Sequence, residues 1–291
     1  MIYILIVSLI WAFSFGLIKG NLNTIDPVFV SFARLFLSLL VFIPFLKVKS
    51  FKNEINEDKS FLWKLLACGA LEYGMMYITY IYSFRYLQAW EVALFTVLTP
   101  VYVTLIDDIL EKRFNRIYLL TAVLAVAGTI IIEYKDMDRQ GLMTGFLIVQ
   151  ISNLCFAFGQ IYYRRIMKSH PAMNDAGIFA WLYLGAVILT GLFSLISVDY
   201  TKLSLSGTQI LTLVYLGIVA SGFCFFLWNA GARKTDAGKL AVLNNLKVPL
   251  SVMVSVFIFG ESGSIVRLAT GGAIVVLALF LPDIYQRVRR I

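Results

Sequence analysis

Long apolar runs, separated only by short charged patches, follow one another almost from end to end of this 291-residue chain. A helix needs roughly 20 apolar residues to cross a bilayer core that is about 30 Å thick. Hydrophobic residues make up 60% of the sequence and charged residues 14%, and the mean hydropathy is +0.83. The apolar runs leave no stretch of chain long enough for a sizeable soluble domain, so the sequence predicts an integral membrane protein.

The apolar runs predict ten transmembrane helices and an all-α fold. Each run is about twice as long as a tilted β-strand needs and lacks an apolar–polar alternation, which excludes a β-barrel. The first run has no basic leading region and no small-residue cleavage site, so we expect it to remain as the first helix. The helices are expected at about 2–20, 27–46, 61–86, 89–110, 116–134, 141–167, 176–197, 208–232, 238–260 and 264–286.

The charged loops predict the orientation of the chain. With the N-terminus in the cytoplasm, most of the 25 Lys and Arg residues fall in cytoplasmic loops, as the positive-inside rule requires. An even number of helices then returns the C-terminus to the cytoplasm. The chain has a net charge of +8, but its basic residues lie between the apolar runs and form no stripe along one helix face. Nucleic acid is therefore not an expected partner.

The two halves of the chain resemble each other at an offset of roughly 143 to 150 positions. The segment from Trp11 to Gly16 matches that from Leu154 to Gly159, and the paired glycines Gly69 and Gly74 match Gly217 and Gly222. We expect one transmembrane domain over 1–291, with repeat one at about 1–135 and repeat two at about 140–291.

An odd number of helices in each half gives the repeats opposite orientations in the membrane. The prediction is therefore ten transmembrane helices as two inverted five-helix repeats. Transporters with inverted repeats place the substrate between the halves near the bilayer midplane and rock one bundle against the other. The repeat thus predicts transport before any single residue is considered.

Several motifs resemble those of the EamA-type drug/metabolite transporter superfamily, and the resemblance covers nearly the whole chain. They are Ile10-Trp-Ala-Phe-Ser-Phe15, Asp26-Pro27 before a helix with Arg34, and Pro100 and Pro249 followed by Glu111 and Glu261. The resemblance implies a secondary transporter of the bacterial inner membrane for amino acids, other metabolites or drugs, often moved outward. Leu154 in place of a second Trp11, and the Asn244-Asn245 pair near Lys247, depart from the pattern and leave the substrate class open.

Two ionisable residues at membrane depth are candidate site residues. Charged groups inside the bilayer cost about 3 kcal/mol on insertion scales, so they usually face a cavity or a partner. Glu72 lies near the middle of the third helix, and Lys247 lies within the ninth. The hypothesis is that Glu72 meets a substrate ammonium while Lys247, with Asn244 and Asn245, meets carboxylate or carbonyl oxygens. The alternative is a mutual ion pair that stabilises the bundle.

Aromatic and amide side chains complete the predicted substrate-binding set. Trp11, Tyr80 and Trp228 could surround an amine by cation–π attraction, and Asn153 belongs to a polar line on the sixth helix. Ordinary packing and interhelical hydrogen bonds would explain each of these residues equally well. Arg34 is either a site residue or an anchor whose side chain extends to the outer interface.

No catalytic or metal-binding motif is present. The cysteines lack CxxC or His-paired spacing, His170 stands alone in a loop, and HExxH, GxGD, GxSxG and Walker patterns are absent. We therefore expect no enzyme, no catalytic residue, no metal and no cofactor. The expected partners are a small-molecule substrate and the lipid bilayer, and a proton and a second copy of the chain are candidates.

The predicted function is a secondary transporter that moves a small polar metabolite across the bacterial inner membrane by alternating access. An amino acid or related amine is the favoured substrate, and export the favoured direction. Two alternatives stay open, an exporter of multiple drugs or organic cations, and a channel. Aromatic richness favours the former, while polar lines on several helices are compatible with the latter.

Overall fold

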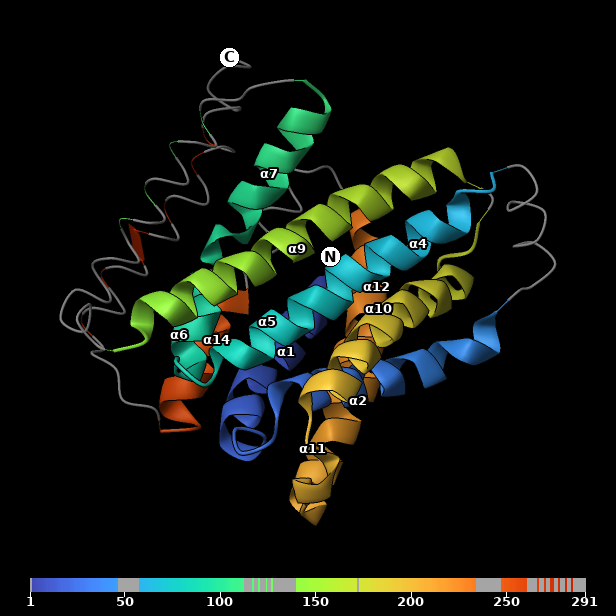
Figure 1. Ribbon diagram of the computed structural model, residues 1–291. Helices are drawn as coiled ribbons and strands as arrows, with labels where there is room; N and C mark the ends of the chain where they lie inside the picture. Colours follow the sequence, from blue (N-terminus) through green and yellow to red (C-terminus); the bar gives the residue numbers. More distant parts are fainter. Residues whose placement is uncertain are drawn as a thin grey trace.

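The computed structural model describes residues 2–46, 58–112, 140–171, 173–233 and 247–260, with isolated positions in 117–127 and 266–284. Within these residues every regular element is helical, which confirms the all-α prediction. Figure 1 shows long helices crossing one another at the centre of the molecule, with α9 lying beside α4 and α5.

The helices follow the predicted segments closely. Their bounds are α1 Ile2–Asn21, α2 Pro27–Phe42, α4 Phe61–Gly69, α5 Met76–Ser83, α6 Ala89–Phe95, α7 Thr99–Leu110, α9 Leu142–Ser169, α10 Asp175–Ser197, α11 Gly207–Tyr215, α12 Cys224–Arg233 and α14 Lys247–Phe257. The isolated described positions in the predicted fifth and tenth helices are helical too, while 238–246 lies outside the described residues. Five described helical segments are long and apolar enough to cross a membrane.

Apolar side chains cover the outside of the bundle, as expected for a protein whose solvent is lipid. On α9, Leu147, Ile151 and Leu154 recur at helical spacing and are about half exposed. Polar residues such as Ser38 and Asn153 are buried instead. This arrangement reverses that of a water-soluble helix bundle and satisfies polar groups inside the protein.

The third helix of each repeat contains a π-helical segment that the sequence did not predict. The segment η2, Ala70–Met75, joins α4 to α5, and η5, Leu216–Phe223, joins α11 to α12. Both fall at the glycine pairs that match between the halves. The predicted continuous α-helices are therefore corrected at equivalent places, and such π-segments are frequent at functional sites.

The helices of the two repeats pack reciprocally against each other. The first repeat's α2 packs on η5 of the second, while α10 packs on η2 and α4. In the same manner α1 packs against α14, and α9 packs against α7. We call this contact between the repeats the seam, and it extends through the centre of the molecule in Figure 1.

A 3-10 turn interrupts the fourth predicted helix. The turn η3, Thr96–Leu98, separates α6 from α7 just before Pro100. Proline has no N–H to donate to the preceding turn, so a regular α-helix cannot run through this position unchanged. The α-helix is thus interrupted directly before Pro100, and the 3-10 turn contacts α9 of the second repeat.

Candidate substrate-binding cavity

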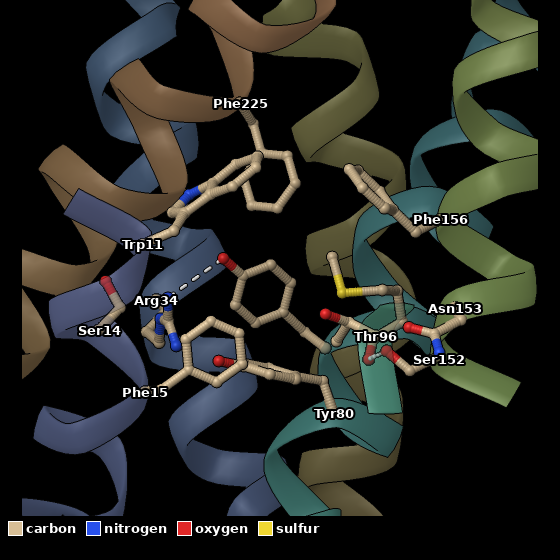
Figure 2. A pocket seen from close by; sticks show the side chains of 12 residues that line it. Trp11, Ser14, Phe15, Arg34, Tyr80, Thr96, Ser152, Asn153, Phe156 and Phe225 are labelled. Carbon is tan, nitrogen blue, oxygen red and sulfur yellow. Dashed lines mark hydrogen bonds between the residues drawn. The ribbon is translucent and has the colours of Figure 1, made fainter. Parts of the chain in front are cut away.

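A cavity lies where the two repeats meet. It encloses about 540 Å³, counting its open mouth, and is lined by α1, α2, α5 and η3 from repeat one and by α9 and α12 from repeat two. Figure 2 shows its lining from close by. The lining residues are Trp11, Ser14, Phe15, Arg34, Met76, Tyr77, Tyr80, Thr96, Ser152, Asn153, Phe156 and Phe225.

Arg34 is the one charged residue among the described lining residues, and it is almost fully buried. Its Nε and Nη2 donate to the Ser221 hydroxyl at 3.2 and 3.1 Å, and Nη2 also donates to the Tyr77 hydroxyl at 3.1 Å. The guanidinium lies 4.6 Å from the centre of the Tyr77 ring. Its Nη1 has no hydrogen-bond partner, and no carboxylate pairs with it among the described residues. Arg34 therefore points into the protein rather than to the helix end.

Neutral polar groups occupy the opposite side of the cavity in Figure 2. The Thr96 hydroxyl donates to the Ala93 carbonyl at 2.7 Å, and the Ser152 hydroxyl donates to the Met76 carbonyl at 3.1 Å. The Asn153 amide donates to the Phe95 carbonyl at 2.9 Å and to Gln150 at 3.0 Å. The Asn153 oxygen also accepts from the Thr99 hydroxyl at 3.1 Å, which leaves it one further acceptor position. Because the hydrogens are already used inside the protein, this side offers mainly acceptor oxygens to a ligand.

Aromatic rings form the walls between the two polar sides. The Trp11 ring lies 4.9 Å from Phe225 and 6.4 Å from Phe156, and its Nε1 donates to the Ala220 carbonyl at 2.9 Å. The Tyr80 ring meets Phe15 edge to face at 5.6 Å. These rings provide an apolar middle to a cavity with polar ends.

Glu72 and Trp228 lie in a fully buried layer beside the cavity rather than in its lining. The Glu72 carboxylate accepts from Asn229 at 2.8 Å and from the Cys68 thiol, and it has no cationic partner among the described residues. Gly159 makes room for it, because a Cβ there would lie 2.2 Å from the Glu72 Cβ. The Trp228 ring lies 5.2 Å from that of Trp11.

The predicted site residues thus fall into three groups. Trp11, Tyr80 and Asn153 line the cavity, and Glu72 and Trp228 lie in the adjoining layer. Asn244 and Asn245 lie outside the described residues, and so does the side chain of Lys247, which begins α14. The roles proposed for Glu72 and Lys247 stay predictions.

Sequence reasoning left Arg34 undecided and missed Thr96 and Ser152. A threonine and a serine are common in membrane helices, and nothing in their spacing distinguishes them from residues that bond only within the bundle. The inward direction of Arg34 also depends on Tyr77 and Ser221, which belong to other helices. No signal in the chain would have found these three together.

Charged groups outside the membrane-spanning segments form surface pairs. Lys64 and Ser60 donate to the Asp58 carboxylate and hold its pKa well below the ordinary value. Lys202 lowers the pKa of Asp199 in the same way. In the part of the chain that the structure describes, no three His, Cys, Asp or Glu residues gather as metal ligands do.

A membrane-spanning helical bundle of two related halves, with a cavity at their seam, defines a membrane transporter. The model of the EamA-like transporter family matches residues 1–134 and again residues 143–281. The chain belongs to this family, and the predicted fold of ten transmembrane helices in two inverted repeats is confirmed.

Comparison with known proteins gives relatives of nearly the same length. A probable biotin transporter of Pseudomonas aeruginosa is 36% identical over 98% of each chain. A biotin transporter of Salmonella typhimurium is 37% identical over 97% of this chain and 92% of its own. A probable amino-acid metabolite efflux pump of the same organism is 22% identical over 98% of this chain and 95% of its own. A crystal structure with a TM-score of 0.72 and 18% identity covers 98% of each chain and shares the fold.

Proposed function

We propose that this chain is a secondary transporter of biotin, or of a small molecule with the same chemical groups, in a bacterial inner membrane. The observation that carries the proposal is the cavity at the seam, in a chain similar over nearly its whole length to proteins named biotin transporters. Biotin has an apolar body, a carboxylate at one end and a neutral ureido group at the other. The cavity offers aromatic walls between polar ends.

The lining favours biotin over the amino acid or amine that we expected from the sequence. A carboxylate at the site would compensate the charge of an ammonium group, and Glu72 was expected to take this role. The Glu72 side chain is enclosed in the layer beside the cavity, and the lining residues that the structure describes include one cation and no acid. The relative named for amino-acid metabolites is also the more distant one, at 22% identity.

The reciprocal packing of the repeats supports alternating access. The cavity is partly open, while Glu72, Asn229, Trp228 and Gln160 are buried together beside it. Rocking of the repeats about the seam would close the mouth and expose the other side. With both termini in the cytoplasm, as the loop charges predict, Arg34 lies in the outer half of the membrane.

A proton is the proposed coupling ion, with Glu72 as its carrier. A buried carboxyl group without a cationic partner can bind and release a proton as the surrounding layer opens to either side. The layer lies next to Trp11, a lining residue, through the Trp228 ring. Substrate binding and proton binding can therefore influence each other over a short distance.

Purified protein in liposomes tests the function. We expect saturable exchange of radiolabelled biotin that unlabelled biotin suppresses and amino acids do not, with protein-free liposomes as the control. Exchange of amino acids without exchange of biotin would refute the biotin proposal and support the amino acid substrate that we expected from the sequence. An imposed pH gradient then distinguishes coupled from passive transport, and reversing the gradient distinguishes proton symport from proton antiport. Large single-channel currents would contradict a carrier.

A further inference from the structure

We propose that Arg34 binds the carboxylate of the substrate, and that the substrate lies across the cavity with neutral N–H groups at the side of Thr96, Ser152 and Asn153. This inference rests on the proposed function and deepens it. It assigns a binding role to a residue that is buried in the seam, and it predicts one orientation and one charge class for the cargo, namely monoanions with an N–H donor at the far end.

The charge of Arg34 carries the first step. A guanidinium stays protonated at any physiological pH, and a buried charge is costly unless an opposite charge compensates it. The described neighbours that accept from Arg34 are the neutral hydroxyls of Ser221 and Tyr77. No carboxylate pairs with it among the described residues, and Nη1 has no partner at all. A substrate carboxylate would supply both the missing charge and the missing acceptor.

The geometry around Arg34 holds the guanidinium in place before a ligand arrives. Nε and Nη2 are fixed by Ser221, and the flat group lies over the Tyr77 ring. Ser221 belongs to η5 of the second repeat, whereas Arg34 and Tyr77 belong to α2 and α5 of the first. A carboxylate bound here therefore contacts a group that both repeats hold, so its binding energy depends on how the repeats are placed.

The opposite side of the cavity determines the orientation of the substrate. The hydrogens of Thr96, Ser152 and Asn153 are donated to protein carbonyls and to Gln150, so their oxygens are left to accept hydrogen bonds. One of the two acceptor positions on the Asn153 oxygen is taken by the Thr99 hydroxyl. A ureido N–H can donate to them, whereas a carboxylate would meet acceptors only. Figure 2 shows these residues across the cavity from Arg34, with aromatic rings between.

The described lining residues include no acid, and this favours a neutral group at the far end of the substrate. An ammonium would suit acceptor oxygens, but the described lining places no carboxylate beside it to offset the positive charge. A neutral urea or amide needs no such partner. We therefore expect a monoanion to bind better than the zwitterion of an amino acid.

The test compares binding of biotin and biotinamide, in which a neutral amide replaces the carboxylate, by titration calorimetry on purified protein. A hydrogen bond to a charged group contributes about 1.5 to 3 kcal/mol, so wild type should bind biotin roughly 10- to 100-fold more tightly than biotinamide. The Arg34→Gln variant should bind the two alike. The Arg85→Gln variant is the matched control, because Arg85 is about half exposed, pairs with Asp26 and lies outside the lining.

The outcomes separate the inference from the function on which it rests. Wild type that binds biotin and biotinamide equally overturns the role of Arg34, and this comparison needs no variant to fold. Arg34→Gln that keeps the preference overturns it too. Should that variant not fold, Arg34→Lys, which keeps the charge, should retain part of the preference. Complete loss of the preference in Arg34→Lys, or an equal loss in Arg85→Gln, would contradict the role of Arg34. Wild type that binds neither compound refutes the proposed function and the inference together.

Discussion

The crossing of α4 and α10 gives a stringent test of how the seam is built. An added Cβ at Gly69 would lie 1.8 Å from the carbonyl oxygen of Leu182, and one at Gly185 would lie 2.1 Å from that of Leu66. Both obstacles are backbone atoms, so no side-chain rotation relieves the clash. The two glycines therefore let helices of opposite repeats approach backbone to backbone, and we expect Gly69→Ala to force them apart.

The contact distances indicate how large the effect is. Non-bonded heavy atoms pack best near 3.5 Å, so α4 and α10 would have to separate by roughly 1.5 Å. Overpacking of a well-packed core typically costs 1 to 3 kcal/mol, and a backbone clash belongs at the upper end, so we expect Gly69→Ala to lower the unfolding free energy by about 3 kcal/mol. Loss of close van der Waals packing is the main cost in a membrane, where lipid replaces the lost contact.

Thermal unfolding in detergent, followed by the fraction that stays monodisperse on size-exclusion chromatography, measures this loss. The matched control is Gly20→Ala in α1, where nothing lies within 4 Å of the added Cβ. We expect the control to unfold at the wild-type temperature or slightly above it, because alanine favours helix over glycine. Equal melting temperatures for the two variants would refute the close crossing of the repeats.

Three further predictions concern coupling, recognition and pH. Glu72→Gln keeps an oxygen for Asn229 but cannot carry a proton, so biotin exchange should persist while accumulation driven by a pH gradient is lost, and unchanged accumulation would exclude Glu72 as carrier. Thr96→Val removes an acceptor from the cavity and should weaken biotin binding about 3- to 10-fold in the calorimeter, with no further loss for an analogue that lacks the ureido N–H groups. The pKa of Asp58 is lowered in the folded state by Lys64, so its contribution to stability is fully present above the ordinary aspartate pKa and falls away in acid. Asp58→Asn should therefore have a slightly lower melting temperature than wild type at pH 7, because an exposed ion pair contributes little. The difference in melting temperature should shrink as the pH falls below about 4. A difference that stays constant with pH would contradict the pairing.

The sequence by itself determined the environment, the helices and the repeat of this protein. Lipid imposes a simple requirement, since each crossing needs an apolar run of sufficient length, and such runs can be counted without knowing what packs on them. The paired motifs, from Trp11 to Gly16 and at Gly69 and Gly74, have counterparts in the second half at a similar offset, and this indicates a repeat without any knowledge of the packing. The interruption of the α-helix before Pro100 also follows from the sequence, because proline lacks an N–H.

Only the tertiary structure decided which buried polar residues meet the cavity. Arg34 and Glu72 are equally conspicuous as charges within apolar runs, yet one lines the cavity and the other is enclosed by Asn229 and Cys68. The difference arises from the rotation of each helix about its axis and from residues far away in the chain, such as Ser221. A sequence pattern determines that a charge must be buried against protein, whereas the packing of the opposite repeat determines what it faces.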